Sequence, residues 1–405
     1  MGAGLQSLVP FLLVMPAFAA VTSAFVEASQ GDEWAIPAEH PRLLIHRGEL
    51  AALRKRCGVV AYRDSAPADA EFAAVQAAWQ RVRALADRTL VSGVSPGQLY
   101  APALAHLVLG EIGTSDEYVR RVEQELRNRT RLLWQQDDAV IALDWCWDAI
   151  SPDVRRSITQ RLAAQIAPLD DRVSPLDHVA FYPRVCDVAA AIALFDPDDR
   201  VSPEAAQVRA VLVAARRYLE GPFVRLWQQK GPAASSPANG LFAEADAVFA
   251  AEIWQTGTGR ALWPQLGDSL GRCVEAYFWS YTGRANMRFG FPRDDGSWAP
   301  DSPGAADESW SVAVPWVLAA RSGSGVARWF VGELPEPSAA QWRISDARAL
   351  RDTLDLLAWP RVIYGDTAAP AVFRQACPLG RHVPRGFVLM RTDWSPDAAV
   401  VMADV

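Results

Sequence analysis

The sequence predicts a mainly α-helical protein whose chain turns to β-strands near its last residues. From about Gly48 to about Leu357 the apolar residues recur at helical spacing, and loops rich in Pro, Gly, Asp and Ser separate the helical stretches. Most of these loops are short, which places consecutive helices side by side in antiparallel pairs. After Trp359 the sequence changes to Pro-rich coil and then to two apolar runs typical of strands. The helical part fits a bundle, a solenoid or a toroid.

The helix with the clearest signals begins after Ser151. Ser151 can cap the helix, Pro152 suits its first turn, and Asp153 favours the positive end of the helix dipole. One apolar stripe follows along this helix: Val154, Ile158, Leu162 and Ile166. A second stripe follows Ser115: Tyr118, Val122, Leu126 and Leu133. The other stretches that we expect to be helical are 70–90, 98–112, 183–195, 204–229, 243–254, 273–281 and 307–320.

The two strand-like runs are 386–391 and 398–405, and they bracket the turn-like segment 393–397. An isolated pair of strands is only marginally stable in water, so these runs need further strands or a helical surface to pack on. We therefore expect residues 359–405 to be a linker and the beginning of a larger antiparallel sheet that is truncated here.

Composition excludes some classes of function and favours others. The formal net charge of −7 and the pI near 5.4 argue against a general nucleic-acid or membrane-surface role, because either needs a basic surface. Half of the 405 residues are hydrophobic and 16 are Trp, which supplies a large core and leaves aromatic faces on which sugar rings can stack. The cysteines are scattered and lack any CxxC spacing: Cys57, Cys146, Cys186, Cys273 and Cys377. We expect buried, inert thiols, no metal site and no cofactor.

The N-terminus has the features of an export signal. An apolar run from Leu8 to Ala20 is followed by small-residue patterns of the kind that signal peptidases cleave. We expect residues 1–24 to be a signal peptide, the mature chain to begin near Ala20 or Phe25, and the protein to be secreted or periplasmic. The first basic residue is Arg42, so a buried N-terminal helix is the alternative. The run is short and contains proline, which argues against its being a membrane span. We expect no membrane span after signal removal.

Three segments, in this order along the chain, carry a resemblance to a known family. The first joins 40–45 to 49–54, the second is 142–152, in which Asp144 and Trp145 precede the capped helix, and the third is 386–394. Together they resemble the heparinase II/III-like polysaccharide lyases and their relatives, the alginate and oligo-alginate lyases. The resemblance implies an incomplete (α/α) toroid over 40–358. It also implies that 359–405 leads into an antiparallel β-sandwich, with a carbohydrate cleft across the toroid.

Such lyases break a glycosidic bond beside a uronic acid by β-elimination. A polar or cationic group neutralises the uronate carboxylate, a Tyr or His removes the C5 proton, and a Tyr or His protonates the leaving oxygen. Residues 177–184 supply these residue types, because His178, Tyr182 and Arg184 lie close together ahead of an apolar helix. Pro183 disfavours a helical conformation at Tyr182, so we expect this segment to be a loop. The resemblance implies that His178 helps to neutralise the carboxylate; the alternative is a surface His and a Tyr packed at the helix edge.

A second candidate loop is 231–246, which contains Asn239 and Glu244. Relatives carry a Glu-Gly pair here with a nearby catalytic Tyr, whereas this chain has Glu244-Ala245 and no Tyr between Tyr218 and Tyr277. We therefore expect Tyr182 to take the place of the missing Tyr. Glu244 is either an orienting group in the site or an acid of a helix start.

A third loop, 284–307, contains Arg288, which can bind a carboxylate, and Trp298, which can stack on a sugar. Trp145 is a second candidate for stacking, and a solvated Arg/Asp loop is the alternative. The acidic groups at 137–138 and 196–199 have the composition of turns and caps. The remaining His residues, which we expect to be structural, are His40, His46, His106 and His382.

The sequence therefore predicts a carbon–oxygen lyase that acts on an acidic polysaccharide or oligosaccharide and binds no nucleic acid. Two alternatives stay open: a toroidal glycoside hydrolase, and a glycan-binding protein that has lost the catalytic Tyr. Elimination leaves an unsaturated uronyl product that absorbs ultraviolet light, hydrolysis leaves none, and a binding protein gives no turnover.

Overall fold

The structure is a computed structural model. It describes residues 36–59, 70–94, 98–110, 114–128, 137–230, 237–266, 270, 291–292, 298–299, 313–321, 358–365, 380–383, 387–391 and 400–404. These residues are mainly helical, which confirms the prediction of a mainly α-helical protein. The expected signal peptide, residues 1–24, lies outside the described residues. Within the described ranges, no helix combines the length and the apolar character needed to cross a bilayer.

The described helices run from the first part of the chain to residue 364. They are η1 (Arg47–Glu49), α2 (Leu50–Arg56), α3 (Ala70–Ser92), α4 (Tyr100–Leu109), α5 (Ser115–Asn128), α6 (Asp137–Trp145), α7 (Pro152–Ala163), α8 (His178–Leu194), α9 (Pro203–Tyr218), η3 (Leu219–Phe223), α10 (Val224–Lys230), α11 (Pro237–Thr258), α13 (Val314–Arg321) and α17 (Trp359–Tyr364).

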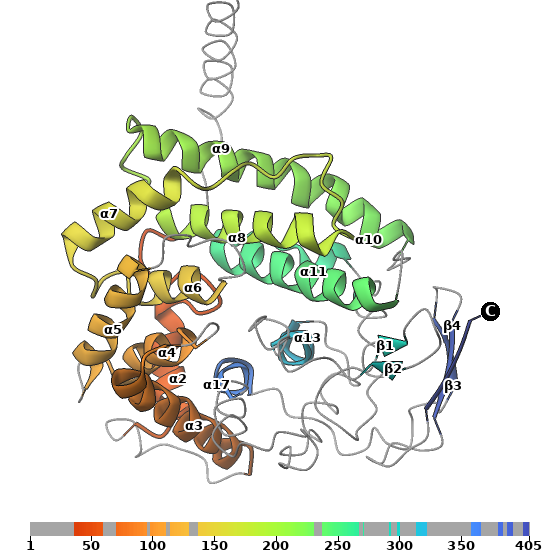
Figure 1. Cartoon of the computed structure of the whole chain (residues 1–405), viewed down its shortest axis with the longest axis horizontal. Helices are drawn as coiled ribbons and strands as arrows, with labels where there is room; N and C mark the ends of the chain where they lie inside the picture. The colour runs from red at the N-terminus through yellow and green to blue at the C-terminus, as the bar shows by residue number, and fades with distance from the viewer. Residues whose placement is uncertain are drawn as a thin grey trace, which may run out of the picture. The chain divides into compact units, whose positions relative to one another are not determined.

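Helices α4, α6, α8, α11, α13 and α17 pack in a series that closes on itself (Figure 1). Each contacts the next in this order, and α17 returns to contact α4. A second set packs against the series: α3 on α4 and α17, α5 on α4 and α6, and both α7 and α9 on α8. Consecutive helices thus alternate between the two sets from α3 to α9, as expected for short connections.

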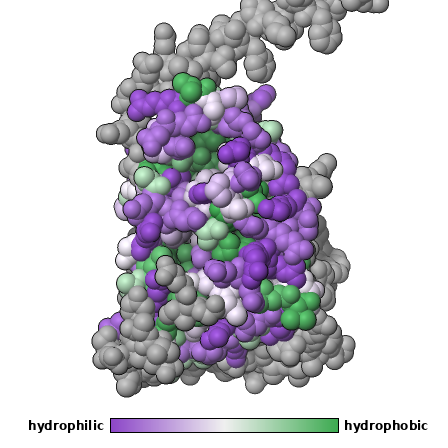
Figure 2. Space-filling model, turned by 90° about the vertical axis from the view of Figure 1, so that its left-hand side faces the viewer, coloured by the Kyte–Doolittle hydropathy of each residue, from purple (hydrophilic) through white to green (hydrophobic). Residues whose placement is uncertain are grey.

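The residue pattern explains which helices belong to the closed series. Every residue of α6 is buried, and so is every residue of α4 except His106, because these helices are covered on all sides. By contrast, α5 and α7 bury mainly one stripe each. Val154, Ile158 and Leu162 of the predicted stripe are buried on α7, whereas Ile166, also buried, lies beyond the end of this helix. The side of the molecule where α5 and α7 lie is largely hydrophilic (Figure 2).

Several predicted boundaries were wrong. Helix α8 begins at His178 rather than at Pro183, which lies inside the helix, and α11 begins at Pro237 rather than near residue 243. The stretch 204–229 is not one helix, since the π-helical turn η3, which contains Pro222, separates α9 from α10. A short antiparallel pair, β1 (Phe291–Pro292) and β2 (Trp298–Ala299), lies within the predicted loop 284–307.

Near the end of the described chain, β3 (Gly380–Val383), β4 (Phe387–Arg391) and β5 (Val400–Asp404) form an antiparallel sheet in the order β3-β4-β5. The two runs predicted as strands correspond to β4 and β5, which pair from Phe387 with Asp404 to Arg391 with Val400. Strand β3 was not predicted, because the Pro-rich sequence of this region indicates coil.

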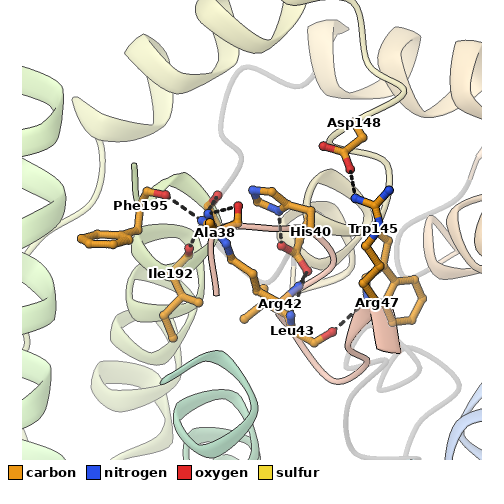
Figure 3. A network of polar contacts seen from close by, with 11 residues as sticks. Ala38, His40, Arg42, Leu43, Arg47, Trp145, Asp148, Ile192 and Phe195 are labelled. Atoms are coloured by element: carbon orange, nitrogen blue, oxygen red, sulfur yellow. Dashed lines mark hydrogen bonds and ion pairs between the residues drawn. The ribbon is translucent and has the colours of Figure 1, made fainter. Parts of the chain in front are cut away.

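The segment 38–45, which we call the N-terminal clasp, binds the second of the three resemblance segments, and the contact of Leu43 with Trp145 is drawn in Figure 3. Asp144 of α6 is fully buried, and its carboxylate lies 2.7 Å from Nδ1 of His40. The same carboxylate accepts hydrogen bonds from the backbone N–H groups of Arg42 and Leu43, each at 2.8 Å. Trp145 donates its indole N–H to the carbonyl of Leu43 at 2.9 Å. The first two resemblance segments therefore bind each other in the folded protein.

The clasp also closes the C-terminal end of α8. The guanidinium of Arg42 donates to the carbonyls of Ile192 at 3.0 Å and Phe195 at 2.7 Å, and to the carbonyl of Ala38 at 2.9 Å. Carbonyls at a helix C-terminus lack partners within the helix, and a cation there also interacts favourably with the helix dipole. Arg42 thus donates hydrogen bonds to carbonyl groups at the end of α8 that have no partner within the helix.

Asp187 on α8 makes the stability of the fold dependent on pH. Its carboxylate accepts hydrogen bonds from Arg184 at 2.6 Å and from the N–H of Ala167 at 3.3 Å, yet burial raises the pKa of Asp187 to about 6. The folded state therefore holds this proton more tightly than the unfolded state does, so stability falls as the pH rises from about 4 to above 6. A shift of this size corresponds to about 3 kcal/mol.

We expect Asp187→Asn to remove this part of the pH dependence. Urea unfolding at pH 4 and pH 7 gives the free energy of unfolding of both proteins. As the pH rises, the free energy of unfolding of the variant should increase relative to that of the wild type. An identical pH dependence in the two proteins would show that Asp187 does not titrate in this range.

Candidate functional site

The first turn of α8 holds the central residue of the candidate site. Asp177 caps the helix by accepting a hydrogen bond from the N–H of Ala180 at 3.2 Å. His178 follows as the first helical residue, and its Nδ1 lies 2.8 Å from the Oδ2 atom of Asp246 on α11. The side chain of Asp246 is 3% exposed and that of His178 is 19% exposed, so the imidazole reaches the surface while its carboxylate partner is buried.

Tyr182 lies one helical turn after His178 on the same face of α8. The ring centroids of His178 and Tyr182 are 5.6 Å apart in a stacked arrangement, and the ring of Phe249 lies 6.0 Å from Tyr182. Tyr182 is only 3% exposed, and its hydroxyl makes no hydrogen bond to any described residue. Burial, reinforced by the carboxylates of Asp137 and Asp246, raises the pKa of Tyr182 well above its usual range.

A tyrosine–carboxylate pair adjoins Tyr182 from two other helices of the closed series. Tyr100, the first residue of α4, donates its hydroxyl to Asp137, the first residue of α6, at 2.6 Å. The ring of Tyr100 also stacks on Trp359 at a centroid distance of 4.5 Å. Both Tyr100 and Asp137 act electrostatically on Tyr182. Helices α4, α6 and α8 therefore all begin at this polar cluster.

Only part of this cluster was predicted from the sequence. The acids at 137–138 have the composition of turn and cap residues, and they do lie in the first turn of α6, where Asp138 accepts the N–H of Leu99 at 3.2 Å. Both are buried, however, and Asp137 binds a tyrosine. Asp246 was also missed. The signal that could have identified these residues is an acid inside an otherwise apolar helix, because a buried carboxylate needs a partner.

The predicted association of His178, Tyr182 and Arg184 in one loop was wrong. The segment is the start of α8, where residues four apart share a face and residues two apart do not. Arg184 accordingly points away from the other two and binds Asp187 instead. The prediction failed because it gave the local effect of Pro183 more weight than the cap at Asp177.

The other predicted site residues have different positions. Trp145 is 2% exposed and bonded to the clasp, so it offers no face to a ligand, contrary to the prediction. Asn239 and Glu244 belong to α11 rather than to a loop, and their side chains are not among those described. The same holds for the side chain of Trp298, in strand β2, and Arg288 lies outside the described residues.

The prediction of buried thiols is confirmed where the structure describes them, and two of the histidines expected to be structural make hydrogen bonds within the fold. His40 binds Asp144, and His106 binds Ser115 at 2.7 Å, with burial lowering the pKa of His106. The described thiols are free and buried, and burial raises the pKa of each: Cys57, Cys146 and Cys186. Cys273 and Cys377 lie outside the described residues. In the described part of the chain no group of three or more His, Cys, Asp or Glu residues is arranged to hold a metal ion.

A second buried polar cluster lies further along α11. Glu252 is fully buried and accepts hydrogen bonds from two nitrogens of Arg321 of α13, from Nη2 at 2.7 Å and from Nε at 3.0 and 3.1 Å. It also accepts from the indole N–H of Trp263 at 3.0 Å and from the hydroxyl of Tyr364 of α17 at 3.2 Å. Glu252 thus links α11, α13 and α17, the helices that complete the closed series.

The chain matches no model of a known protein family, and none of the curated proteins matches it.

Proposed function

We propose that this protein is a polysaccharide lyase that cleaves a uronic-acid-containing polysaccharide by β-elimination, in an incomplete (α/α) toroid followed by the first strands of a β-sandwich. The observation that carries the proposal is the imidazole of His178, bound by the buried carboxylate of Asp246 and stacked on Tyr182. The closed series of helix contacts supports the toroid, and the sheet β3-β4-β5 supports the sandwich. The resemblance of three segments to heparinase II/III-like lyases supports the reaction class.

The arrangement suits β-elimination because the reaction needs a proton-transfer group beside a uronate. His178 is the group of the cluster that keeps an exposed edge, whereas Tyr182 lies behind it with a raised pKa. We therefore assign contact with the substrate to His178, and to Tyr182 the support of the imidazole ring. Asn239 and Glu244 precede Asp246 on α11 and remain candidates for substrate binding, as do Arg288 and Trp298.

The test is an assay with alginate and with a glucuronate-containing glycosaminoglycan. We expect a product that absorbs ultraviolet light, because elimination leaves a double bond between C4 and C5 of the new non-reducing end. The control is His178→Gln, which keeps a polar side chain at this position and removes only the imidazole. Binding without turnover would contradict the proposal and favour a glycan-binding protein.

A toroidal glycoside hydrolase is the second candidate, and one observation favours it. The carboxylates of Asp137 and Asp246 both act on Tyr182, so two buried acids lie near one hydroxyl. Glycosidases generally use two carboxylates. New reducing ends without ultraviolet absorbance would identify hydrolysis in the same assay.

A further inference from the structure

We infer that Asp246 is a positioning residue that holds the His178 imidazole with its proton on Nδ1, so that Nε2 is the atom that exchanges protons with the substrate. The inference rests on the proposed function and deepens it. The resemblance implies that His178 helps to neutralise the uronate carboxylate. The exposed edge of its ring and the carboxylate bound to Nδ1 also suit it to the proton transfer itself.

The pairing indicates which ring nitrogen carries the proton when the carboxylate of Asp246 is ionised. The Oδ2 atom of Asp246 lies 2.8 Å from Nδ1 of His178, within hydrogen-bond distance. An ionised carboxylate can only accept hydrogen bonds, so Nδ1 must be the donor. The neutral ring then has its lone pair on Nε2, and proton transfer by this residue proceeds through that atom.

Burial makes the carboxylate effective in this role. Asp246 is 3% exposed and comes from α11, which packs directly against α8, so the ring is held between elements of the core. The ring of Tyr182, which stacks on the imidazole, further restricts its orientation. When Nε2 takes a proton, the imidazolium that forms lies against the carboxylate, which stabilises it.

The elimination then needs no reactant other than the substrate and His178. Nε2 of His178 takes the C5 proton, and the electron pair of the C–H bond forms the C4–C5 double bond as the bond between C4 and the glycosidic oxygen breaks. The imidazolium returns the proton to the leaving oxygen. The ring ends in its starting tautomer, with the proton on Nδ1 still donated to Asp246.

The experiment records the ¹⁵N chemical shifts of the His178 ring in the whole protein, for the wild type and for Asp246→Asn. We expect the wild type to carry its neutral-state proton on Nδ1. In the variant the amide can donate to Nδ1, so the tautomer with the proton on Nε2 should become populated. Turnover of the uronate polymer should fall by ~10²-fold or more, with KM changed much less.

Two further variants separate positioning from a structural role. Glu252→Gln changes another buried acid of α11 and should leave the His178 tautomer as in the wild type, whatever it does to stability. The double variant His178→Gln/Asp246→Asn should be no slower than His178→Gln alone, because Asp246 acts through His178.

Two results would overturn the inference: a wild-type ring with its neutral-state proton on Nε2, or an Asp246→Asn protein with the wild-type tautomer and turnover. The tautomer is measured without substrate. A protein that cleaves no uronate polymer would therefore contradict the proposed function, while the ring nitrogens still decide the role of Asp246.

Discussion

Replacing Asp144 with alanine should lower the free energy of unfolding by about 4 kcal/mol. The carboxylate is fully buried and is the acceptor for His40 and for the backbone N–H groups of Arg42 and Leu43, at 2.7–2.8 Å. Its removal leaves three buried groups without their acceptor, and each such loss costs about 1–3 kcal/mol. The clasp would also lose its main attachment to α6, so the variant should unfold at markedly lower urea concentration.

Asp148 provides the matched control, since it lies one turn further along the same segment. Its side chain is 60% exposed and forms an ion pair with Arg47 at 3.4 Å. Exposed pairs of this kind contribute less than about 1 kcal/mol, so Asp148→Ala should unfold almost as the wild type does. A loss below 1 kcal/mol for Asp144→Ala would mean that the clasp does not stabilise the fold. Urea unfolding followed by far-ultraviolet circular dichroism gives both values.

The helices could be predicted from the sequence wherever their signals are local. The stripe Val154, Ile158 and Leu162 follows closely on the start signals at 151–153, and α7 begins at Pro152 and buries this stripe as they indicate. Ser151 occupies the N-cap position, but its side chain makes no capping hydrogen bond. At α8 two local signals conflicted, because Pro183 disfavours a helix and Asp177 favours one. Burial of Phe181 and Tyr182 on the inner side of the helix supports the start at His178.

The pairings that build the site and the clasp could not be predicted, because they join residues far apart in the sequence. His178 and Asp246 are separated by 68 positions, and His40 and Asp144 by 104. Periodicity and caps carry no information about such distances. Residue type and resemblance nevertheless indicate His178. Asp246 was not predicted, and Trp145 was predicted to bind substrate, because burial depends on the tertiary fold.

The two proton-transfer candidates, His178 and Tyr182, should differ sharply when each is replaced. His178→Gln should lower turnover by ~10²–10⁴-fold, the usual range for loss of a general acid–base group. Tyr182→Phe should lower it by less than about tenfold. The Tyr182 hydroxyl is buried, has a raised pKa and makes no hydrogen bond to a described residue, while the phenyl ring that stacks on His178 is retained.

His106→Gln is the control for loss of an imidazole elsewhere in the fold. His106 binds Ser115 on α5 and is not part of the polar cluster, so its replacement should leave turnover within about threefold of the wild type. Initial rates of ultraviolet absorbance on one uronate polymer compare the three variants directly, with circular dichroism to establish that each is folded. If Tyr182→Phe loses as much activity as His178→Gln, the proton is transferred by the tyrosine, and the imidazole returns to the charge-neutralising role that the family resemblance implies. If neither variant differs from the wild type, the cluster is structural and the reaction takes place elsewhere in the chain.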